Sequence, residues 1–361
     1  MTYGLNDICL VPARTSRIEH RADCNPYNFD GMLPLFTAPM NSVINENNYE
    51  VFLRNKINTI IPRGVDYDKR WELSTSTFVA LGLSEFERFI TDFENIYDTT
   101  NDIRYVCVDI ANGHMLKLID LCSQAKSIFG GRLSLMAGNI ANPDTYADYS
   151  LAGIDFVRIG VGGGSVCTTS ANGGIHYAMA SLINEVVDKK RAIEKCIEET
   201  KVVNIAGDSG FYSGCNSITH PYKSVPFIIA DGGFDNYDKI IKALALGADY
   251  VMVGKLFAQS QEACGELLPV TDPNLGLRRK YYGMSTKKAQ IEIGNQKLKT
   301  AEGIETTVPV LYKLQDWCEN FVDYLRSMMS YSDSFDLLEF RKTKYRIVSP
   351  LEYLLSLIHI S

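Results

Sequence analysis

The sequence predicts an α/β fold in which eight parallel strands close into a (β/α)8 barrel. Eight short apolar segments recur along the chain, and most are followed by a polar or glycine-containing turn and then by a stretch with helical periodicity. Alternating strands and helices predict a parallel sheet, and eight such units predict a closed barrel. An open, doubly wound sheet is the alternative. We rank it second because all eight segments have the short, apolar character of buried strands.

The predicted strands are, in chain order, residues 33–40, 57–64, 77–83, 105–110, 133–139, 156–161, 226–231 and 250–254. Helical periodicity is clearest at residues 115–129 and 237–246. A chain of 361 residues is long enough for one barrel with insertions. We therefore expect a single barrel domain over residues 1–350, followed by a tail at 351–361 to which no role is assigned.

Two segments depart from the regular alternation. Residues 178–225, between the sixth and seventh predicted strands, form an insertion with a charged helical stretch and then a loop rich in Gly, Ser and Asn. A charged helix is most often simply solvent-exposed, which is the interpretation we favour. The more specific alternative is that the insertion forms a lid or a subunit contact. After the eighth strand, residues 285–303 are predicted to form a flap, in which residues 291–299 resemble a hairpin around a Gly-Asn turn.

Composition narrows the class of protein. A hydrophobic content of 46% with 22% charged residues predicts an ordinary globular core. The net charge is -7 and the basic residues are scattered, so we expect no nucleic-acid partner. Nine cysteines occur singly, without metal-binding spacing, which indicates a reducing compartment. No signal-peptide pattern and no bilayer-length apolar run are visible, so we expect a cytoplasmic protein without a membrane partner.

Polar and glycine residues follow the ends of most predicted strands. In a barrel these ends converge on one face, where ligands bind. Taken singly, such residues most often form turns or caps, but their joint occurrence predicts a ligand site there. They are Asn41, Ser42, Arg63, Asp109, Asn112, Asn139, the loop at 160–169, Asp231, Gly232, Gly233 and Gly254.

The loop after the sixth strand reads G-V-G-G-G-S-V-C-T-T at residues 160–169. Glycine amides can surround an anion without obstruction by a Cβ atom. The thiol of Cys167 is a candidate nucleophile beside such an anion site. A flexible glycine-rich turn with an inert cysteine is the alternative, and the loop alone does not decide between the two.

Together with D-G-G at Asp231, Y-Y-G-M-S at Tyr281 and A-E-G at Ala301, this loop resembles the IMP dehydrogenase/GMP reductase family. The likeness runs from N-D-I-C-L-V-P near the start, through T-A-P-M-N-S-V at Thr37, to about Val348. The resemblance implies a (β/α)8 barrel, a purine nucleotide as the small-molecule substrate and a homotetramer.

Several motifs resemble the reductase branch of that family. D-I-A-N-G at Asp109 stands where the dehydrogenases carry D-S-S-Q-G, and M-A-G-N at Met136 and C-T-T at Cys167 also look like the reductases. Residues 65–76 leave no room for the regulatory repeats that the dehydrogenases usually carry, and residues 286–300 show no evident Arg-Tyr pair. Glu302 replaces a glutamine of the dehydrogenases, and its carboxylate can accept hydrogen bonds from the N1 and 2-amino donors of guanine.

The resemblance therefore implies NADPH-dependent reductive deamination of GMP to IMP and ammonia. Cys167 would add to C2 of guanine and form a thioimidate, and hydride from NADPH would then release IMP. Thr169 and Glu302 would deliver protons. The thiol of Cys167, with an ordinary pKa of about 8.5, must be deprotonated locally.

The resemblance also implies the binding residues. The phosphate would lie on the amides around Ser165, Gly233 and Gly254 with the hydroxyl of Tyr282, Asp231 would hold the ribose, and Ser42 and Met284 would line the purine pocket. The full set of implied substrate contacts is Ser42, Ser165, Asp231, Gly232, Gly233, Gly254, Lys255, Tyr282, Gly283, Met284 and Ser285. The implied cofactor contacts are Asp109, Ala111, Asn112, Gly113 and Asn139. The carbonyls of Gly162, Gly164 and Cys167 are candidate ligands of a monovalent cation such as K+.

Three features depart from the family pattern. Gly162-Gly163-Gly164 replaces Gly-Pro-Gly, Ser170 replaces an arginine, and the insertion at 178–225 has no counterpart. The alternatives that stay open are IMP dehydrogenase (IMP to XMP with NAD), a reductase of another guanine nucleotide, deoxy or modified, and a non-catalytic nucleotide-binding barrel. The last is disfavoured because pure binding needs no nucleophile at Cys167.

Overall fold

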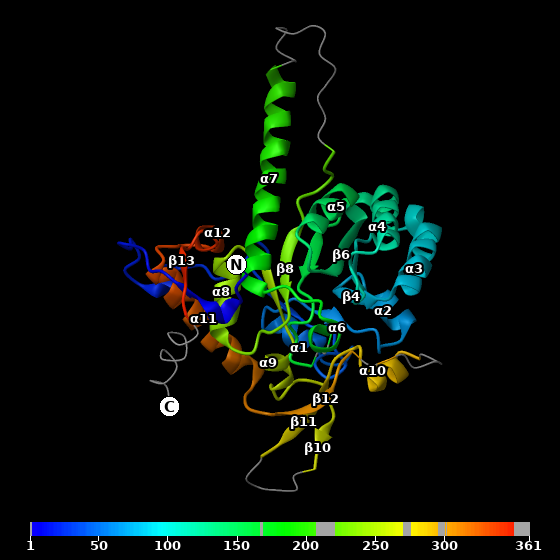
Figure 1. Cartoon of the computed structure of the whole chain (residues 1–361). Coiled ribbons are helices and arrows are strands. Elements are labelled where there is room, and N and C mark those ends of the chain that lie inside the picture. The colour runs from blue at the N-terminus through cyan, green and yellow to red at the C-terminus, as the bar shows by residue number, and fades with distance from the viewer. Residues whose placement is uncertain are drawn as a thin grey trace.

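An eight-stranded parallel sheet forms the centre of the molecule (Figure 1) in this computed structural model, which describes residues 2–166, 169–206, 221–269, 276–294, 300 and 302–349. The strand order is β2-β9-β8-β7-β6-β5-β4-β3. An isolated parallel bridge between Phe36 of β2 and Asn58, just before β3, joins the two edges of the sheet. The predicted (β/α)8 barrel is therefore confirmed.

All eight barrel strands begin and end within their predicted segments or one residue outside them. Their mostly buried side chains explain why apolar runs were a sufficient signal. The strands are β2 Leu35–Thr37, β3 Ile60–Ile61, β4 Phe78–Leu81, β5 Arg104–Asp109, β6 Leu133–Ile140, β7 Phe156–Ile159, β8 Phe227–Asp231 and β9 Tyr250–Val253.

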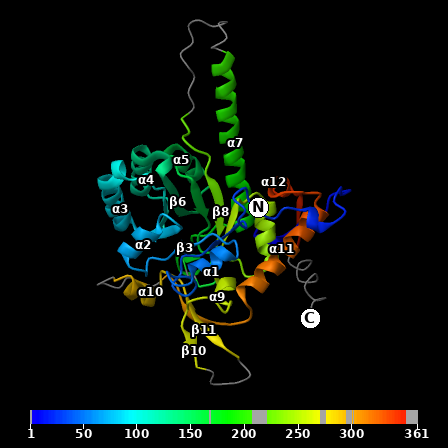
Figure 2. The same cartoon turned by 180° about the vertical axis from the view of Figure 1, so that it is seen from behind.

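Helices surround the barrel and cover its outer face (Figures 1 and 2). In α3 the buried residues Phe86, Phe89 and Phe93 are three or four positions apart, so that one apolar stripe faces the sheet. The helices up to the last barrel strand and just after it are α1 Tyr49–Arg54, α2 Tyr67–Leu73, α3 Leu83–Ile96, α4 Leu116–Phe129, α5 Asp144–Ala152, α6 Thr169–Gly173, α7 Met179–Ala206, α8 Tyr237–Ala245 and α9 Lys255–Ala258.

Aromatic rings fill the barrel interior. Phe36 packs against Tyr250 with ring centroids 5.1 Å apart, and Phe78 packs against Phe156 at 5.4 Å. Phe78, Phe156 and Tyr250 stand at the first residue of their strands, so this layer occupies the amino-terminal end of the barrel. The polar groups at the carboxyl ends of the strands consequently lie above a packed floor.

The insertion between β7 and β8 is dominated by α7, whose 28 residues give a length of about 42 Å. Its first half packs on the barrel through buried residues such as Ile183 and Val187. Its second half rises beyond the barrel, at the end opposite to the strands β10 to β12 (Figure 1). The charged stretch is thus a helix, as predicted, whereas the loop at 207–220 lies outside the described residues. Within the described ranges, no helix has both the length and the apolar character needed to cross a membrane.

The chain after β9 adds a small antiparallel sheet and further helices. β10 Leu267–Leu268, β11 Arg278–Tyr282 and β12 Glu305–Pro309 form the sheet, and β1 Ile8–Leu10 pairs with β13 Tyr345–Ile347. The remaining helices are α10 Lys287–Glu292, α11 Leu314–Tyr331 and α12 Leu337–Phe340. The tail at 351–361 lies outside the described residues.

The predicted hairpin around Gly294 is wrong for the part of the flap that the structure describes. Ile291 and Glu292 form the last turn of α10. The side chain of Thr286 caps this helix by accepting a hydrogen bond from the Ala289 amide at 3.2 Å, and Gly294 follows the helix with φ +79°. The cap at Thr286 and the glycine that follows the helix outweighed the local β propensity of the segment.

Candidate active site

Two glycine loops at the carboxyl ends of β7 and β8 lie backbone against backbone. A Cβ atom on Gly160 would be 2.2 Å from the carbonyl oxygen of Asp231, and one on Gly233 would be 2.9 Å from the carbonyl oxygen of Gly163. Gly160 also has φ +122°, a conformation that disfavours side chains. The loops predicted to cradle a phosphate are therefore in contact, and their close approach requires glycine.

The end of β9 completes this cradle with a hydroxyl. A Cβ atom on Gly254 would be 3.0 Å from the Tyr281 hydroxyl oxygen. The same hydroxyl hydrogen-bonds with the side chain of Ser165, and burial raises the pKa of Tyr281 to about 12. Gly254, Ser165 and Tyr281 thus meet at one point, and the tyrosine stays protonated at neutral pH.

The neighbouring tyrosine has a different partner. Tyr282 donates from its hydroxyl to Glu292 Oε1 at 2.8 Å, and Asn41 donates to Glu292 Oε2 at 2.6 Å. Successive side chains on a strand point to opposite faces, which separates Tyr281 from Tyr282. The sequence prediction named Tyr282 for the phosphate, whereas the hydroxyl that the structure brings to the cradle belongs to Tyr281. Two consecutive tyrosines gave no signal to choose between them.

Cys167 and the side chain of Thr169 lie outside the described residues, but the segments around them are described. Val166 accepts a backbone hydrogen bond from Ile304 at 3.0 Å, and a Cβ atom on Gly303 would be 3.1 Å from the same carbonyl oxygen. Glu302, which is exposed, immediately precedes this contact. The fold therefore brings the segment that carries Glu302 to the residue before Cys167.

The candidate purine-pocket segments also converge near Val166. Ser42, fully buried, donates from its hydroxyl to the Tyr282 carbonyl at 3.3 Å. A Cβ atom on Gly283 would be 3.3 Å from the Val166 side chain, and one on Gly303 would be 2.8 Å from Ser285 Oγ. Met284 lies between Gly283 and Ser285 in the chain. Lys255 starts α9, directly after Gly254.

A buried arginine joins the two carboxylates of the site. Arg158 of β7 donates to Asp109 Oδ1 at 2.6 Å and to Asp231 Oδ2 at 2.9 Å. Asn139 donates to the same Asp231 oxygen at 2.8 Å and to the Gly160 carbonyl at 2.9 Å. Burial by itself lowers the pKa of Arg158, but attraction to Asp109 and then to Asp231 holds it well above its ordinary value.

Sequence analysis missed Arg158 because it lies within the apolar run F-V-R-I of a predicted strand. An arginine is almost never fully buried unless it is paired, so a charge inside a buried strand was the available signal. Its two partners, Asp109 and Asp231, were both predicted as site residues. The structure shows that they share one guanidinium.

The predicted cofactor loop after β5 is held by a histidine. His114 Nε2 accepts from the amides of Ala141 at 3.0 Å and Asn142 at 3.2 Å. Its Nδ1 is 3.1 Å from Asn112 Oδ1, so this hydrogen-bond network assigns the proton to Nδ1. Burial lowers the pKa of His114, which favours the same neutral form.

The other cofactor candidates lie on this loop or against it. Gly113 donates from its amide to the Asn139 carbonyl at 2.9 Å, and Tyr149 donates to the Gly113 carbonyl at 2.7 Å. Ala111 and Asn112 are exposed. The loop is therefore anchored from below while two of its residues face outward.

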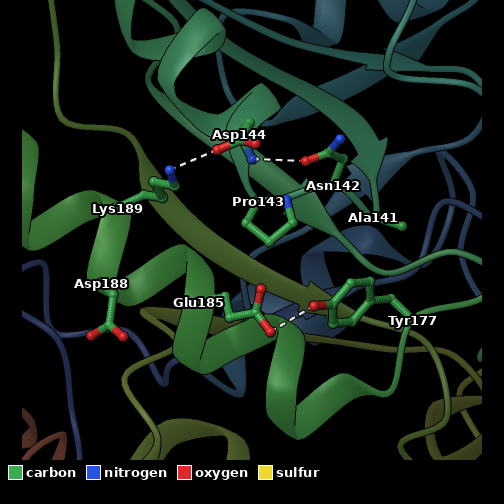
Figure 3. A pocket seen from close by; sticks show the side chains of 8 residues that line it. All are labelled: Ala141, Asn142, Pro143, Asp144, Tyr177, Glu185, Asp188 and Lys189. Carbon is green, nitrogen blue, oxygen red and sulfur yellow. Dashed lines mark hydrogen bonds and ion pairs between the residues drawn. The ribbon is translucent and has the colours of Figure 1, made fainter. Parts of the chain in front are cut away.

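A pocket of about 610 Å³ lies beside this loop, between the start of α5 and the first half of α7. In Figure 3, Lys189 reaches Asp144 and Tyr177 reaches Glu185, and the corresponding distances are both 2.6 Å. The lining residues are Ala141, Asn142, Pro143, Asp144, Tyr177, Glu185, Asp188 and Lys189. Sequence analysis assigned no function to this pocket.

The candidate cation ligands are partly described. The carbonyl of Gly162 accepts a hydrogen bond from Ser170 Oγ at 3.0 Å, so the residue that replaces the family arginine binds the loop itself. In the part of the chain that the structure describes, no group of three or more His, Cys, Asp or Glu side chains is arranged to hold a metal. A cation on the loop carbonyls stays a prediction.

These features define a (β/α)8 barrel with a candidate ligand site at the carboxyl ends of its strands, built from glycine loops and a buried arginine-aspartate network. Residues 67–214 and 197–351 match the model of the IMP dehydrogenase / GMP reductase domain, and the chain belongs to that family.

Similar proteins carry the name GMP reductase. The protein from Buchnera aphidicola is 24% identical over 94% of this chain and 92% of its own length. That from Caenorhabditis elegans is 25% identical over 93% of this chain and 88% of its own length. That from Onchocerca volvulus is 27% identical over 73% of this chain and 63% of its own length.

Proposed function

We propose that this protein is a GMP reductase, which converts GMP to IMP and ammonia with a reduced nicotinamide dinucleotide. The observation that carries the proposal is the backbone contact between Ile304 and Val166. It brings the segment of Glu302, the candidate guanine-binding carboxylate, to Val166, which directly precedes the candidate nucleophile Cys167 in the sequence. Family membership and the relatives named GMP reductase support the same activity.

The nucleotide would be anchored by its phosphate. Amides around Ser165, Gly233 and Gly254 would bind the phosphate oxygens, and we assign the accompanying hydroxyl to Tyr281 because it already lies between Ser165 and Gly254. A tyrosine hydroxyl is protonated at neutral pH, and burial raises the pKa of Tyr281 further, so it can donate to the phosphate. An anchored phosphate fixes the purine at a constant distance from the end of β7.

The ribose would bind Asp231. Arg158 and Asn139 both donate to Oδ2 of this carboxylate. We therefore assign the ribose hydroxyls to Oδ1, whose orientation the two donors determine. Arg158 acts here as a positioning residue, because it holds the carboxylate and does not itself contact the reacting atoms.

Cys167, as a thiolate, would add to C2 of guanine, and protons delivered by Thr169 and Glu302 would allow the 2-amino group to leave as ammonia. The product of that step is a thioimidate between Cys167 and the purine. A bound reduced nicotinamide supplies the hydride that replaces sulfur at C2. The nicotinamide end would be held by Asp109, Ala111, Asn112, Gly113 and Asn139. These residues fit that role because the loop that carries Asn112 is exposed and is anchored from below.

The direct test follows the absorbance of the reduced cofactor together with ammonia and IMP in a mixture of protein, GMP and either NADPH or NADH. Cys167→Ala should abolish turnover while GMP binding, measured by calorimetry, persists. Cys196→Ala on α7 is the matched control and should retain turnover. Absence of oxidation with both dinucleotides, or turnover by the Cys167→Ala variant, would contradict the proposal.

A panel of nucleotides separates the remaining activities. Oxidation with a deoxy or modified guanine nucleotide in place of GMP would assign a different substrate to the same chemistry. Formation of XMP from IMP and NAD would assign the dehydrogenase reaction, and tight purine binding without any turnover would assign a binding protein. Glu302→Gln should weaken GMP binding more than IMP binding, because IMP keeps the N1 donor but lacks the 2-amino donor.

A further inference from the structure

Two backbone amides join the pocket of Figure 3 to the predicted cofactor loop, because Ala141 and Asn142, which line the pocket, both donate to His114 Nε2. Asn142 lines the pocket and donates from its amide to His114, the residue that holds Asn112. Asn139, which binds Asp231, is three residues away, a span of at most about 10 Å. If the nicotinamide end of a dinucleotide lies at Asn112 and Asn139, as proposed above, its adenosine end can reach this pocket.

The charge of the pocket is negative. Among the described residues that line it, Asp144, Glu185 and Asp188 are carboxylates, and Lys189 is the single cation. That cation is already engaged, because its ammonium group lies 2.6 Å from Asp144 Oδ1. A newly bound anion would therefore meet Glu185 and Asp188, the latter 3.4 Å from Arg191 at its edge, and no free ammonium group among the described lining residues.

NADPH and NADH differ at one group of the adenosine ribose. NADPH carries a 2′-phosphate, and a phosphate monoester has a charge of about -1.5 to -2 at neutral pH. NADH carries a 2′-hydroxyl in its place. Carboxylates accept hydrogen bonds from ribose hydroxyls, whereas a 2′-phosphate is accommodated by arginine.

We infer that this pocket takes the adenosine ribose of NADH and disfavours the 2′-phosphate of NADPH. The inference rests on the proposed function and departs from the NADPH that the family resemblance implies. It also gives a role to the insertion, because Glu185, Asp188 and Lys189 all belong to α7.

An adjacent groove offers the competing arrangement. It lies against the same turns of α7, is lined by Arg191, Arg341 and Lys342, and has a volume of about 490 Å³. Arg341 is bound to Asp249 at 3.3 Å, and Arg191 lies 3.4 Å from Asp188. If a 2′-phosphate reached this groove instead, Arg191→Gln would weaken NADPH binding and leave NADH binding unchanged.

The test is direct binding of each dinucleotide to the whole protein, followed by the fluorescence of the reduced nicotinamide with and without saturating GMP. We expect NADH to bind at least tenfold more tightly than NADPH. The double substitution Glu185→Gln and Asp188→Asn removes both negative charges with little change of shape. It should reduce the ratio of the NADPH dissociation constant to the NADH dissociation constant about tenfold.

Glu199→Gln is the matched control. It removes one carboxylate from the exposed part of the same helix, 14 residues beyond Glu185 and about 21 Å away. This distance exceeds the Debye length of about 8 Å at physiological salt, so the ratio should not change. Thermal unfolding of each variant checks that the fold is retained.

Tighter binding of NADPH than of NADH by the unaltered protein would overturn the inference. So would a ratio unaffected by the double substitution, or a loss of NADPH binding in Arg191→Gln alone. These outcomes leave the proposed GMP reductase activity intact, because GMP-dependent oxidation of NADPH could still occur. Selective binding of NADH without GMP-dependent oxidation would instead contradict the proposed function and leave the pocket assignment standing.

Discussion

The two halves of the barrel mouth are held by different kinds of contact. On the nucleotide side, the loops after β7 and β8 meet through backbone atoms, and a Cβ atom at Gly160 would overlap the Asp231 carbonyl. On the cofactor side, the loop after β5 also approaches backbone at Gly113, but it is held in addition by side chains, with Arg158 bound to Asp109 and His114 bound to Asn112. The first half depends on close backbone approach, and the second depends also on charges and protons that must stay paired.

This difference determines how each half should fail. An added methyl group on the nucleotide side causes a collision that no side-chain movement relieves, because the neighbouring atoms are backbone. A removed partner on the cofactor side leaves a largely buried charge or an unsatisfied donor, so the cost should vary with pH.

The largest effect is expected for Arg158→Met. Asp109 and Asp231 would be left as largely buried, unpaired carboxylates, and the free energy of unfolding should fall by about 4 kcal/mol. Denaturant unfolding of the variant and of the unaltered protein at pH 7 measures this loss.

Arg158→Lys is the control for that substitution, because it keeps the charge and loses the second branch of the guanidinium. It should cost less than Arg158→Met. A loss below about 1 kcal/mol for Arg158→Met would show that the network does not carry the expected charge coupling.

Gly160→Ala comes next. The positive φ and the overlap with the Asp231 carbonyl should lower the free energy of unfolding by about 3 kcal/mol, and GMP binding should be lost with the loop geometry. Gly131→Ala is the matched control, because its Cβ atom would meet nothing within 4 Å. Its effect should stay within about 0.5 kcal/mol. Equal effects of the two substitutions would refute the argument from close approach.

Tyr281→Phe and Tyr282→Phe test whether these two neighbouring residues of β11 have different roles. Loss of a hydrogen bond to a charged phosphate should weaken GMP binding about tenfold in Tyr281→Phe. Tyr282→Phe removes the bond to Glu292 instead, and should lower the stability by about 1 kcal/mol while GMP affinity is unchanged. Calorimetric titration with GMP distinguishes them, and the reverse pattern would return the phosphate contact to Tyr282.

The smallest effect concerns His114. Its folded-state pKa is lowered by burial, so the unfolded chain binds the proton more readily. The stability it contributes should be fully present above its ordinary pKa of about 6.5 and decrease as the pH falls below that value. The difference in unfolding free energy between the unaltered protein and His114→Gln, measured from pH 5 to 8, should show this decline. A flat difference would contradict a neutral, hydrogen-bonded His114.

Sequence patterns were reliable where one local property decides the outcome. Strands buried on both faces are mostly apolar, which is why all eight lie within their predicted segments or at most one residue outside them. The described part of the hairpin predicted around Gly294 was wrong because the short segment around Ile291 carries weak β and helical signals at once. The cap at Thr286 decided between them.

The sequence by itself determined the barrel and the glycine loops, because burial and close backbone approach restrict residue type at each position independently. Only the tertiary structure decided that Arg158 binds Asp109 and Asp231, which are 49 and 73 residues away from it in the chain. It likewise decided that Tyr281 faces the cradle and that α7 contributes negative charge beside the cofactor loop. Pairing across a barrel depends on strand register and on which helix lies next to which loop, and neither is encoded in any single stretch of residues.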